Sequence, residues 1–216
     1  MSKIKLVMLD FDGTTADTTP SILYCADKVC QSEGYTLDHE LLARNTGYTT
    51  EEAFRFLTGS NDEELIERLS AKYRDMYISE GLNMITLFDG VLETMERLHA
   101  QGVKFSIATN NITPIIDYSV KRLGMAPFLD NIVCLDNVAE GKPAPDIALE
   151  SMRLAGCSVE ESIVVGDSTF DMGMGRNAGC RCCGVTYGSH DRQTLFNDGA
   201  TWVIDSFREL EKIVLG

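Results

Sequence analysis

Basic residues are scarce in this sequence: 19 Lys and Arg stand against 33 Asp and Glu, which gives a formal net charge of −14. Because a nucleic acid duplex carries dense negative charge, a chain this acidic is a poor general nucleic-acid binder. Long apolar runs are absent as well. No segment has about 18 or more consecutive apolar residues, so we expect no membrane span. The apolar run at residues 4–9 is interrupted by Lys5 and is too short for a signal peptide, so we expect a cytoplasmic protein.

Histidine is also rare, and this bears on a possible metal site. Three of the seven cysteines stand in CRCC at residues 180–183, but a zinc site needs a second pair of ligands at suitable spacing. The three histidines, His39, His99 and His190, form no such pair. We interpret CRCC as part of a buried strand. An odd number of cysteines in a chain with no export signal indicates reduced thiols, which again favours the cytoplasm.

Internal repeats and low-complexity linkers are missing, and most of the chain alternates short apolar runs with amphipathic runs. The 216 residues, 44% of them apolar, suit one large domain or one domain with an insertion. The expected strands are residues 3–10, 103–109, 132–136, 162–167, 180–187 and 201–205, and the expected helices are residues 114–124, 145–156, 170–179, 192–199 and 207–216. Wholly apolar strands separated by helices indicate a parallel sheet covered on both faces. We therefore predict an α/β fold with a doubly wound, Rossmann-like parallel sheet.

The stretch from residue 16 to about residue 86 follows another pattern, which contains helical segments and no expected strand. The helical segments are residues 20–34, 38–45, 49–59 and 61–81. TTEE and NDEE place a capping residue before glutamates, as is typical of a helix N-terminus. We predict an α/β core formed by residues 1–15 and 88–216, with an all-helical domain at residues 16–87 inserted into it.

Polar residues follow the expected strands where these strands end. They are Asp10, Asp12 and Gly13, then Thr109 and Asn110, then Lys142, and finally Asp167 and Asp171. Two carboxylates one residue apart repel each other and lose hydration at the end of a buried strand, so their presence needs a reason. Ligands of a doubly wound sheet bind at the carboxyl ends of its strands. We expect these residues to converge on one site.

The same residues resemble the motifs of the haloacid dehalogenase (HAD) superfamily of phosphatases. DFDGT at 10–14 is similar to its first motif, the Thr of ATN at 108–110 to the second, the Lys of GKP at 141–143 to the third, and GDSTFD at 166–171 to the fourth. The helical insertion resembles the helical cap of the family's first type. The end of the chain, residues 184–210, is similar to the phosphoglycolate-phosphatase branch. The resemblance covers the whole chain and implies a phosphatase.

The resemblance assigns Asp10 as the nucleophile, which forms an acyl phosphate and so divides the hydrolysis into two steps. Asp12 lies two residues further on, and the period of a strand places it on the same side. It is expected to protonate the leaving oxygen and then to deprotonate the attacking water, a role that needs a raised pKa. Gly13 permits a sharp departure of the backbone.

The expected cofactor is Mg²⁺. Four carboxylates and one Lys give the site a net charge of −3, which would repel a phosphate dianion, and a hard divalent cation offsets this charge. Following the family, the metal ligands are Asp10, the backbone carbonyl of Asp12, and Asp167, while Asp171 acts through a water or by positioning Lys142.

The resemblance also implies how the phosphate is bound. The Thr109 hydroxyl and the Asn110 backbone N–H are expected to donate to phosphate oxygens, and Lys142 to neutralise charge on the phosphoryl group and on Asp10. A loop or helix-capping role for Thr109 and Asn110 is the alternative.

Three related activities compete with hydrolysis of a small phosphate ester. Haloacid dehalogenases lack the second aspartate, and phosphonoacetaldehyde hydrolases replace it, so Asp12 argues against both. Mutases of the β-phosphoglucomutase type keep both aspartates but typically carry an Arg just after the cap glycine, whereas Gly47 is followed here by YTTEE. Thr15 replaces an apolar residue of the family pattern, which leaves the substrate less defined. Phosphoglycolate is the single best guess.

Other features keep two interpretations open. The segment at residues 44–52 begins a helix whose N–H groups could bind a substrate carboxylate, or it is an ordinary capped turn, with Arg44 only a charge on a helix face. A non-catalytic phosphate-ligand-binding regulatory protein on the same fold is a further alternative. The expected partner is a small phosphorylated metabolite, and the protein is expected to be a monomer or homodimer.

Overall fold

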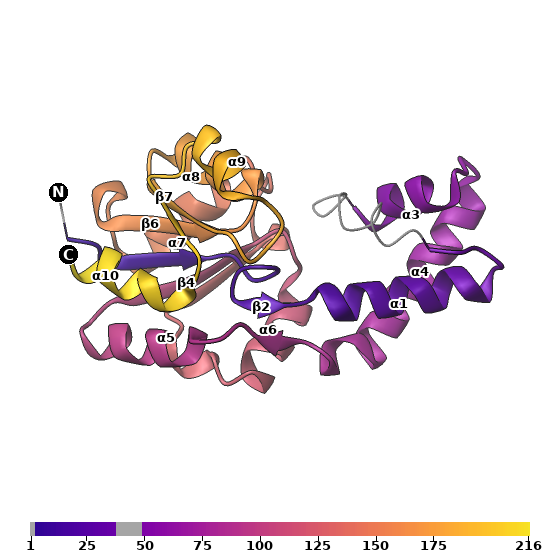
Figure 1. Ribbon diagram of the computed structural model, residues 1–216, viewed down its shortest axis with the longest axis horizontal. Coiled ribbons are helices and arrows are strands. Elements are labelled where there is room, and N and C mark those ends of the chain that lie inside the picture. Colours follow the sequence, from indigo (N-terminus) through magenta and orange to yellow (C-terminus); the bar gives the residue numbers. More distant parts are fainter. Residues whose placement is uncertain (1–2, 38–48) are drawn as a thin grey trace. The chain divides into compact units, whose positions relative to one another are not determined.

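The computed structural model describes residues 3–37 and 49–216, which form two compact units. One unit contains the chain up to Asp17 together with Thr86–Gly216, and the other is Thr18–Ile85. Figure 1 shows the first unit as a sheet with helices and the second as helices alone. None of the helices in the described ranges is both long and apolar enough to cross a membrane.

The first unit contains a six-stranded sheet in the order β5-β4-β1-β6-β7-β8. Every neighbouring pair in this sheet is parallel. The strands are β1 (Leu6–Leu9), β4 (Lys104–Thr109), β5 (Asn131–Cys134), β6 (Ser162–Gly166), β7 (Arg181–Val185) and β8 (Trp202–Ile204). The predicted Rossmann-like parallel sheet is confirmed, and each strand is one to four residues shorter than the predicted one.

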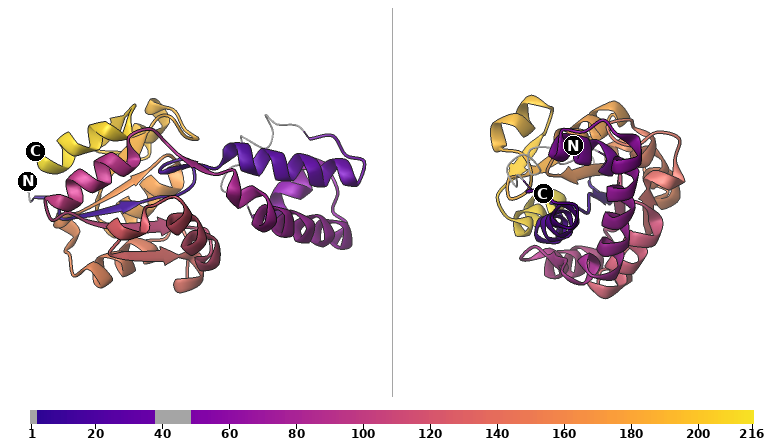
Figure 2. Two further views of the ribbon diagram at one scale, coloured as in Figure 1. Left: turned by 90° about the horizontal axis from the view of Figure 1, so that it is seen from below. Right: turned by 90° about the vertical axis from the view of Figure 1, so that its right-hand side faces the viewer.

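Helices cover both faces of this sheet, as Figure 2 shows. They are α5 (Val91–Ala100), α6 (Thr113–Arg122), α7 (Asp146–Ala155), α8 (Thr169–Ala178), α9 (Arg192–Asn197) and α10 (Leu210–Leu215), with short 3₁₀ turns between some of them. Helices α7 and α8 pack on each other, as do α5 and α10. All four residues of β1 are buried, which explains why this run is apolar without alternation.

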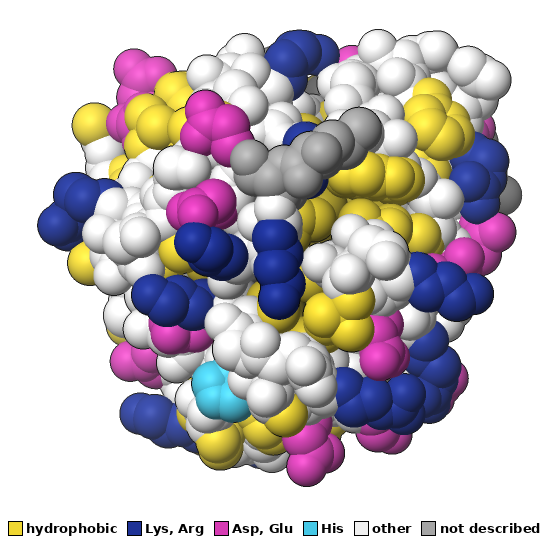
Figure 3. Space-filling model, turned by 90° about the vertical axis from the view of Figure 1, so that its left-hand side faces the viewer, with side chains coloured by type: hydrophobic (Ala, Val, Ile, Leu, Met, Phe, Trp, Pro, Cys, Tyr) yellow, Lys and Arg dark blue, Asp and Glu magenta, His cyan; other side chains and the backbone are white. Residues whose placement is uncertain are grey.

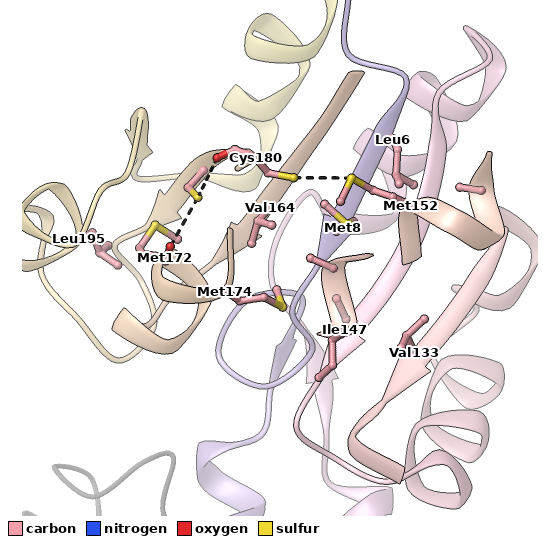
Figure 4. Packing of buried hydrophobic residues seen from close by; sticks show 14 of the residues in the cluster. Leu6, Met8, Val133, Ile147, Met152, Val164, Met172, Met174, Cys180 and Leu195 are labelled. Atoms are coloured by element: carbon pink, nitrogen blue, oxygen red, sulfur yellow. Dashed lines mark hydrogen bonds between the residues drawn. The ribbon is translucent and has the colours of Figure 1, made fainter. Parts of the chain in front are cut away.

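The core beneath α7 and α8 is rich in sulfur. Figure 4 shows Met8, Met152, Met172, Met174 and Cys180 gathered between these helices and the sheet. The Cys180 thiol lies 3.7 Å from the Met152 sulfur. The CRCC run is indeed strand β7 with its preceding residue, and Cys180, Cys182 and Cys183 are buried and unpaired. Burial raises the pKa of Cys180 to about 11 and those of Cys182 and Cys183 to about 12, so these thiols stay protonated at neutral pH.

The second unit is helical among its described residues. It contains α1 (Thr19–Ser32), α3 (Thr50–Thr58), α4 (Glu63–Ser79) and a 3₁₀ turn at Gly81–Asn83. Thr49 and Glu52 form the expected capping box of α3, and Asp62 caps α4. A cluster that includes Phe54 and Leu69 forms its hydrophobic core. The predicted helix at 38–45, Arg44 and Gly47 lie outside the described residues.

The expectation that no strand occurs between residues 16 and 86 is wrong. Strands β2 (Ala16–Asp17) and β3 (Thr86–Leu87) pair antiparallel where the chain leaves and re-enters the α/β unit. Each strand has only two residues, too few for an alternating pattern to show in the sequence.

The strands of the main sheet begin at an edge that carries basic side chains. On the face shown in Figure 3, Lys and Arg side chains gather around hydrophobic ones. Lys3, Arg181 and Lys212 line a pocket there together with Trp202. No Asp or Glu side chain is among the described residues that line this pocket. Asp10 and Asp167 instead follow β1 and β6, at the edge where the parallel strands end.

Helix α8 approaches the sheet closely at Gly175. A Cβ added there would lie 2.2 Å from the Cys182 Sγ and 3.2 Å from Val164. We expect Gly175→Ala to lower the free energy of unfolding by about 1–3 kcal/mol through overpacking, although Ala favours helices over Gly. Urea denaturation of Gly175→Ala, Cys182→Ala and the double variant measures this. The double variant should be more stable than the sum of the single effects predicts, and additive effects would contradict the close contact.

Candidate active site

Lys142 lies at the centre of a buried group of charges at the carboxyl edge of the sheet. Its Nζ donates to Asp10 Oδ1 at 2.5 Å and to Asp171 Oδ1 at 2.6 Å. Only 7% of Lys142, 8% of Asp10 and 1% of Asp171 are exposed. An ion pair this deeply buried is stable only where its geometry is good and its polar atoms are satisfied.

The sheet order brings these residues together from distant parts of the sequence. Asp10 follows β1, which pairs with β4 on one side and with β6 on the other. Asp167 follows β6, and Asp171 is in the first turn of α8. Thr109 is the last residue of β4. Hydrogen bonds to Lys142 and the grouping of the three carboxylates bring Asp10, Asp167 and Asp171 together, as predicted. Thr109 ends the neighbouring strand at the same edge.

Asp167 is held through both carboxylate oxygens. Its Oδ2 accepts the Ser189 backbone N–H at 2.6 Å, and its Oδ1 accepts the Thr14 hydroxyl at 3.3 Å. Gly13, which lies just before Thr14, has a φ of +76°. A Cβ at Gly13 would lie 2.4 Å from Asp167 Oδ2, so a side chain is excluded there by space as well as by the backbone conformation.

Asp171 connects the lysine to the start of a helix. While Oδ1 binds Lys142, Oδ2 accepts the Ser168 hydroxyl at 2.6 Å and the Ser168 backbone N–H at 3.1 Å. Ser168 is the N-cap of α8, and the two residues form a capping box. Both oxygens of Asp171 are thus engaged by the protein, which fits a positioning role toward Lys142.

The carboxylates can hold a hard cation. One oxygen each of Asp10, Asp167 and Asp171 lies within 4.8 Å of the other two, and all three residues are buried. Carboxylate oxygens are ligands for Mg²⁺ and Ca²⁺ rather than for soft metals. Asp171 accepts three hydrogen bonds, from Lys142 and twice from Ser168, whereas Asp167 accepts two and the Asp10 carboxylate one. Asp10 and Asp167 therefore have the most freedom to coordinate. The residues present therefore fit a divalent metal.

Repulsion within the group is visible in the pKa values. Burial raises the pKa of Asp10 well above its ordinary value, Lys142 opposes this effect, and the other carboxylates add to it. Burial and the neighbouring Asp171 raise the pKa of Asp167. Burial alone would lower the pKa of Lys142, but the Asp10 and Asp171 carboxylates raise it, so the ammonium stays charged. A second cation would relieve the excess negative charge.

Comparison with known proteins places this site in a family. Residues 7–185 match the family model described as haloacid dehalogenase-like hydrolase. The chain is 30% identical over 219 residues to a phosphoglycolate phosphatase of Vibrio parahaemolyticus, covering 98% of this chain and 96% of the relative. It is 27% identical over 216 residues to the pyrophosphatase PpaX of Bacillus velezensis, covering 96% and 95%. A solved structure from Bacteroides fragilis, described as a haloacid dehalogenase-like hydrolase, superimposes with a TM-score of 0.87 at 28% identity, covering 96% of this chain and all of that one.

The chain belongs to the haloacid dehalogenase-like hydrolase family. The predicted resemblance to this family is thereby confirmed, and so is the prediction of an enzyme of the phosphatase type. Many further relatives match, but they do not carry a single activity in their names.

Asp12 differs from expectation in its local geometry. Strand β1 ends at Leu9, so the two-residue period of a strand does not extend to Asp12, which instead forms an isolated bridge with Ala16. Asp12 is half-buried, and its Oδ2 accepts the Asn111 side-chain amide at 3.3 Å. Its role as the acid and base of this HAD hydrolase stays a prediction.

Thr109 and Asn110 are both at the site, and neither caps helix α6. The N-cap of α6 is Ile112, with no side-chain cap, so the helix-capping half of the alternative is wrong. The loop half holds, since the Thr109 hydroxyl accepts the Asn111 backbone N–H within the loop after β4. The Asn110 side chain accepts the Lys142 backbone N–H at 2.7 Å and donates to the Lys142 carbonyl at 3.2 Å. This anchor was not predicted, because only the backbone of Asn110 was considered. A Cβ at Gly141 would lie 2.6 Å from the Asn110 Oδ1, which explains the glycine before Lys142.

Substitution of Asp167 tests whether its buried negative charge, placed beside the other carboxylates of the site, destabilises the folded protein. Its pKa is raised from an ordinary value of 3.8 in the folded state. The folded protein therefore loses stability as pH rises from that value through the raised pKa. In EDTA at about pH 7.5, we expect Asp167→Asn to raise the free energy of unfolding by on the order of 1 kcal/mol, because a buried charge is removed. The gain should shrink as the pH approaches about 4.

Urea denaturation with EDTA and with Mg²⁺ measures this effect. Asp75→Asn, on an exposed position of α4, is the control and should stay within about 0.5 kcal/mol of wild type. With saturating Mg²⁺ the wild type should have a higher free energy of unfolding than Asp167→Asn, since a ligand stabilises the folded state that binds it. A variant that is less stable than wild type in EDTA at the higher pH would contradict the repulsion.

Proposed function

We propose that the protein is a Mg²⁺-dependent phosphatase that hydrolyses a small phosphate monoester through an aspartyl-phosphate intermediate on Asp10. The observation that carries this proposal is the position of Asp10. It is a buried carboxylate at the end of the central strand, held at 2.5 Å by Lys142 and grouped with Asp167. A carboxylate in this setting is a fixed nucleophile beside groups that neutralise a phosphoryl group.

In the first step, an Asp10 oxygen forms a bond to phosphorus while the bond from phosphorus to the ester oxygen breaks. Asp12 gives its proton to the leaving oxygen, and the product alcohol departs. In the second step, Asp12 takes a proton from water, the water oxygen attacks phosphorus, and the bond to Asp10 breaks to release inorganic phosphate. Asp12 therefore has the same protonation state after the two steps as before them, as general acid–base catalysis requires.

Lys142 and the loop after β4 position the phosphoryl group. The Lys142 ammonium fixes the Asp10 carboxylate and offsets charge on the phosphoryl oxygens. The Thr109 hydroxyl accepts the Asn111 backbone N–H at 3.1 Å, so its own proton is left to donate to a phosphate oxygen. The Asn110 backbone N–H is the second donor in this proposal.

Asp10, the backbone carbonyl of Asp12, and Asp167 would hold Mg²⁺, with Asp171 positioning Lys142. The cation supplies positive charge that brings the phosphate dianion into an otherwise anionic site. Without it, four aspartates and one lysine give the site a charge of −3 when all are ionised, or −2 when Asp12 is protonated for the first step.

The substrate is proposed from the relatives. A phosphoglycolate phosphatase and a pyrophosphatase match this chain almost equally well, at 30% and 27% identity. We take phosphoglycolate as the first candidate and inorganic pyrophosphate as the second. The helical unit, predicted as a cap at residues 16–87, is proposed to set specificity, because the core residues serve the phosphoryl group that all candidate substrates share.

Phosphate release from a panel of phosphate esters and pyrophosphate tests the activity, with Mg²⁺ or EDTA and with Asp10→Asn as the variant. We expect turnover that needs the metal and falls by about 10⁴-fold or more in Asp10→Asn, because the nucleophile is lost. Equal activity of Asp10→Asn and wild type would overturn the mechanism.

Two alternatives have their own signatures in this panel. Conversion of β-glucose 1-phosphate to glucose 6-phosphate without phosphate release would identify a mutase. A non-catalytic protein would show no turnover and no thermal shift with Mg²⁺ and beryllium trifluoride, a mimic of the phosphoryl group.

Asn110→Ala tests the anchor of Lys142. The variant removes both hydrogen bonds to the Lys142 peptide, so we expect kcat to fall by about 10–100-fold, the loss typical of a misplaced catalytic group. Asn177→Ala is the matched control. The exposed Asn177 side chain donates to the carbonyl of Pro143, the residue after Lys142, at 2.9 Å. A loss in Asn177→Ala as large as in Asn110→Ala would show that general loosening of the loop, rather than the placement of Lys142, is responsible.

A further inference from the structure

We propose that Tyr187–His190, the segment that follows β7, is a positioning element that fixes the Asp167 carboxylate and thereby sets the affinity of the site for a divalent cation. This inference rests on the proposed function, because it concerns the metal of that same site. None of the four family motifs includes this segment, which belongs to the stretch 184–210 that resembles the phosphoglycolate-phosphatase branch.

The backbone of the segment holds Asp167 at two points. The Ser189 N–H donates to Oδ2 at 2.6 Å, and the His190 N–H donates to the Asp167 carbonyl at 3.2 Å. One bond fixes the carboxylate and the other fixes the main chain of the same residue. The short bond to an ionised oxygen belongs to the stronger class of hydrogen bonds.

Two glycines enclose the same carboxylate oxygen. A Cβ at Gly188 would lie 2.3 Å from Asp167 Oδ2 and 2.5 Å from the Gly13 carbonyl oxygen, and a Cβ at Gly13 would lie 2.4 Å from Oδ2. A side chain at either position would push against the carboxylate. Gly188 therefore lets the segment approach both Asp167 and the loop that follows β1.

Tyr187 closes a ring of contacts around Asp167. Its hydroxyl donates to the Thr14 carbonyl at 2.9 Å, and the Thr14 hydroxyl donates to Asp167 Oδ1 at 3.3 Å. The ring of Tyr187 packs on that of Phe88, with centroids 4.6 Å apart. Burial raises the pKa of Tyr187, so its hydroxyl keeps the proton that it donates.

These contacts orient the Asp167 carboxylate but leave its oxygens able to accept further ligands. Each carboxylate oxygen can accept about two hydrogen bonds or ligand contacts, and each Asp167 oxygen receives one bond from Ser189 or Thr14. A cation can therefore coordinate without displacing these bonds. Groups that orient a metal ligand in this way typically change metal affinity by about 10–100-fold when they are removed.

Isothermal titration of the metal-free protein with Mg²⁺ tests the proposal on wild type, Tyr187→Phe and Gly188→Ala. We expect Mg²⁺ affinity to fall by about 10-fold in Tyr187→Phe and by about 100-fold in Gly188→Ala. The phosphatase kcat of Tyr187→Phe at saturating Mg²⁺ should stay within a few-fold of wild type, because Asp10 and Lys142 are untouched. Tyr187→Phe keeps the test valid if Gly188→Ala does not fold.

Two control variants separate positioning from general stability. Tyr24→Phe removes a hydroxyl that also donates at 2.9 Å, to Glu80 in the helical unit. Gly102→Ala introduces strain at a φ of +81° where no atom lies within 4 Å of the added Cβ. Both should bind Mg²⁺ as wild type does, even where the melting temperature falls.

The outcomes distinguish this inference from the proposed function. Wild-type affinity in both Tyr187→Phe and Gly188→Ala overturns the inference and leaves the phosphatase proposal standing. Weakened binding in the two variants, together with a wild type that binds Mg²⁺ but hydrolyses no ester, supports the inference while the proposed activity fails. A wild type that does not bind Mg²⁺ overturns the inference.

Discussion

The contact of the Lys142 ammonium with Asp10 and Asp171 is the interaction on which the site depends. It joins the end of the central strand, the loop before α7 and the first turn of α8. Buried charges are costly unless they are paired and hydrogen-bonded. One ammonium cannot neutralise three buried carboxylates, and burial together with repulsion from the neighbouring carboxylates raises the pKa values of Asp10 and Asp167. The site is therefore built for additional positive charge, which is what phosphoryl transfer requires.

A layer of contacts behind these residues fixes their geometry. The Asn110 amide holds the Lys142 peptide, Ser168 holds Asp171, and Thr14 with Ser189 holds Asp167. Two of these four bonds involve backbone N–H groups, those of Lys142 and Ser189. The glycines at 13, 141 and 188 leave room for the close approaches that such bonds need. The groups proposed to react thus rest on strand ends and tight loops, an arrangement that favours preorganisation.

The fold and the acidic edge of the sheet could be predicted from the sequence because both leave strong local patterns. Wholly apolar runs predicted the buried strands, and aspartates placed just after two of them predicted the acidic edge. The β2–β3 ladder has two residues per strand and leaves no pattern. The side-chain bonds of Asn110, and the contact of Tyr187–His190 with Asp167, join residues more than 20 positions apart. Such bonds depend on three-dimensional placement, and the bond from Ser189 uses a backbone N–H, which every residue type except proline has, so no residue pattern reveals them.

Asp12 shows where a prediction from the two-residue period of a strand stops being valid. The two-residue period of a strand holds only while the backbone stays extended, and β1 ends at Leu9, before either aspartate. What places Asp12 is the turn that follows, which needs the positive φ of Gly13 and returns at Ala16. The same turn presents Thr14 to Asp167 and to Tyr187. A single glycine-dependent turn therefore links the proposed acid–base residue to the proposed metal ligand, so the first motif and the end of β6 act as one structural unit.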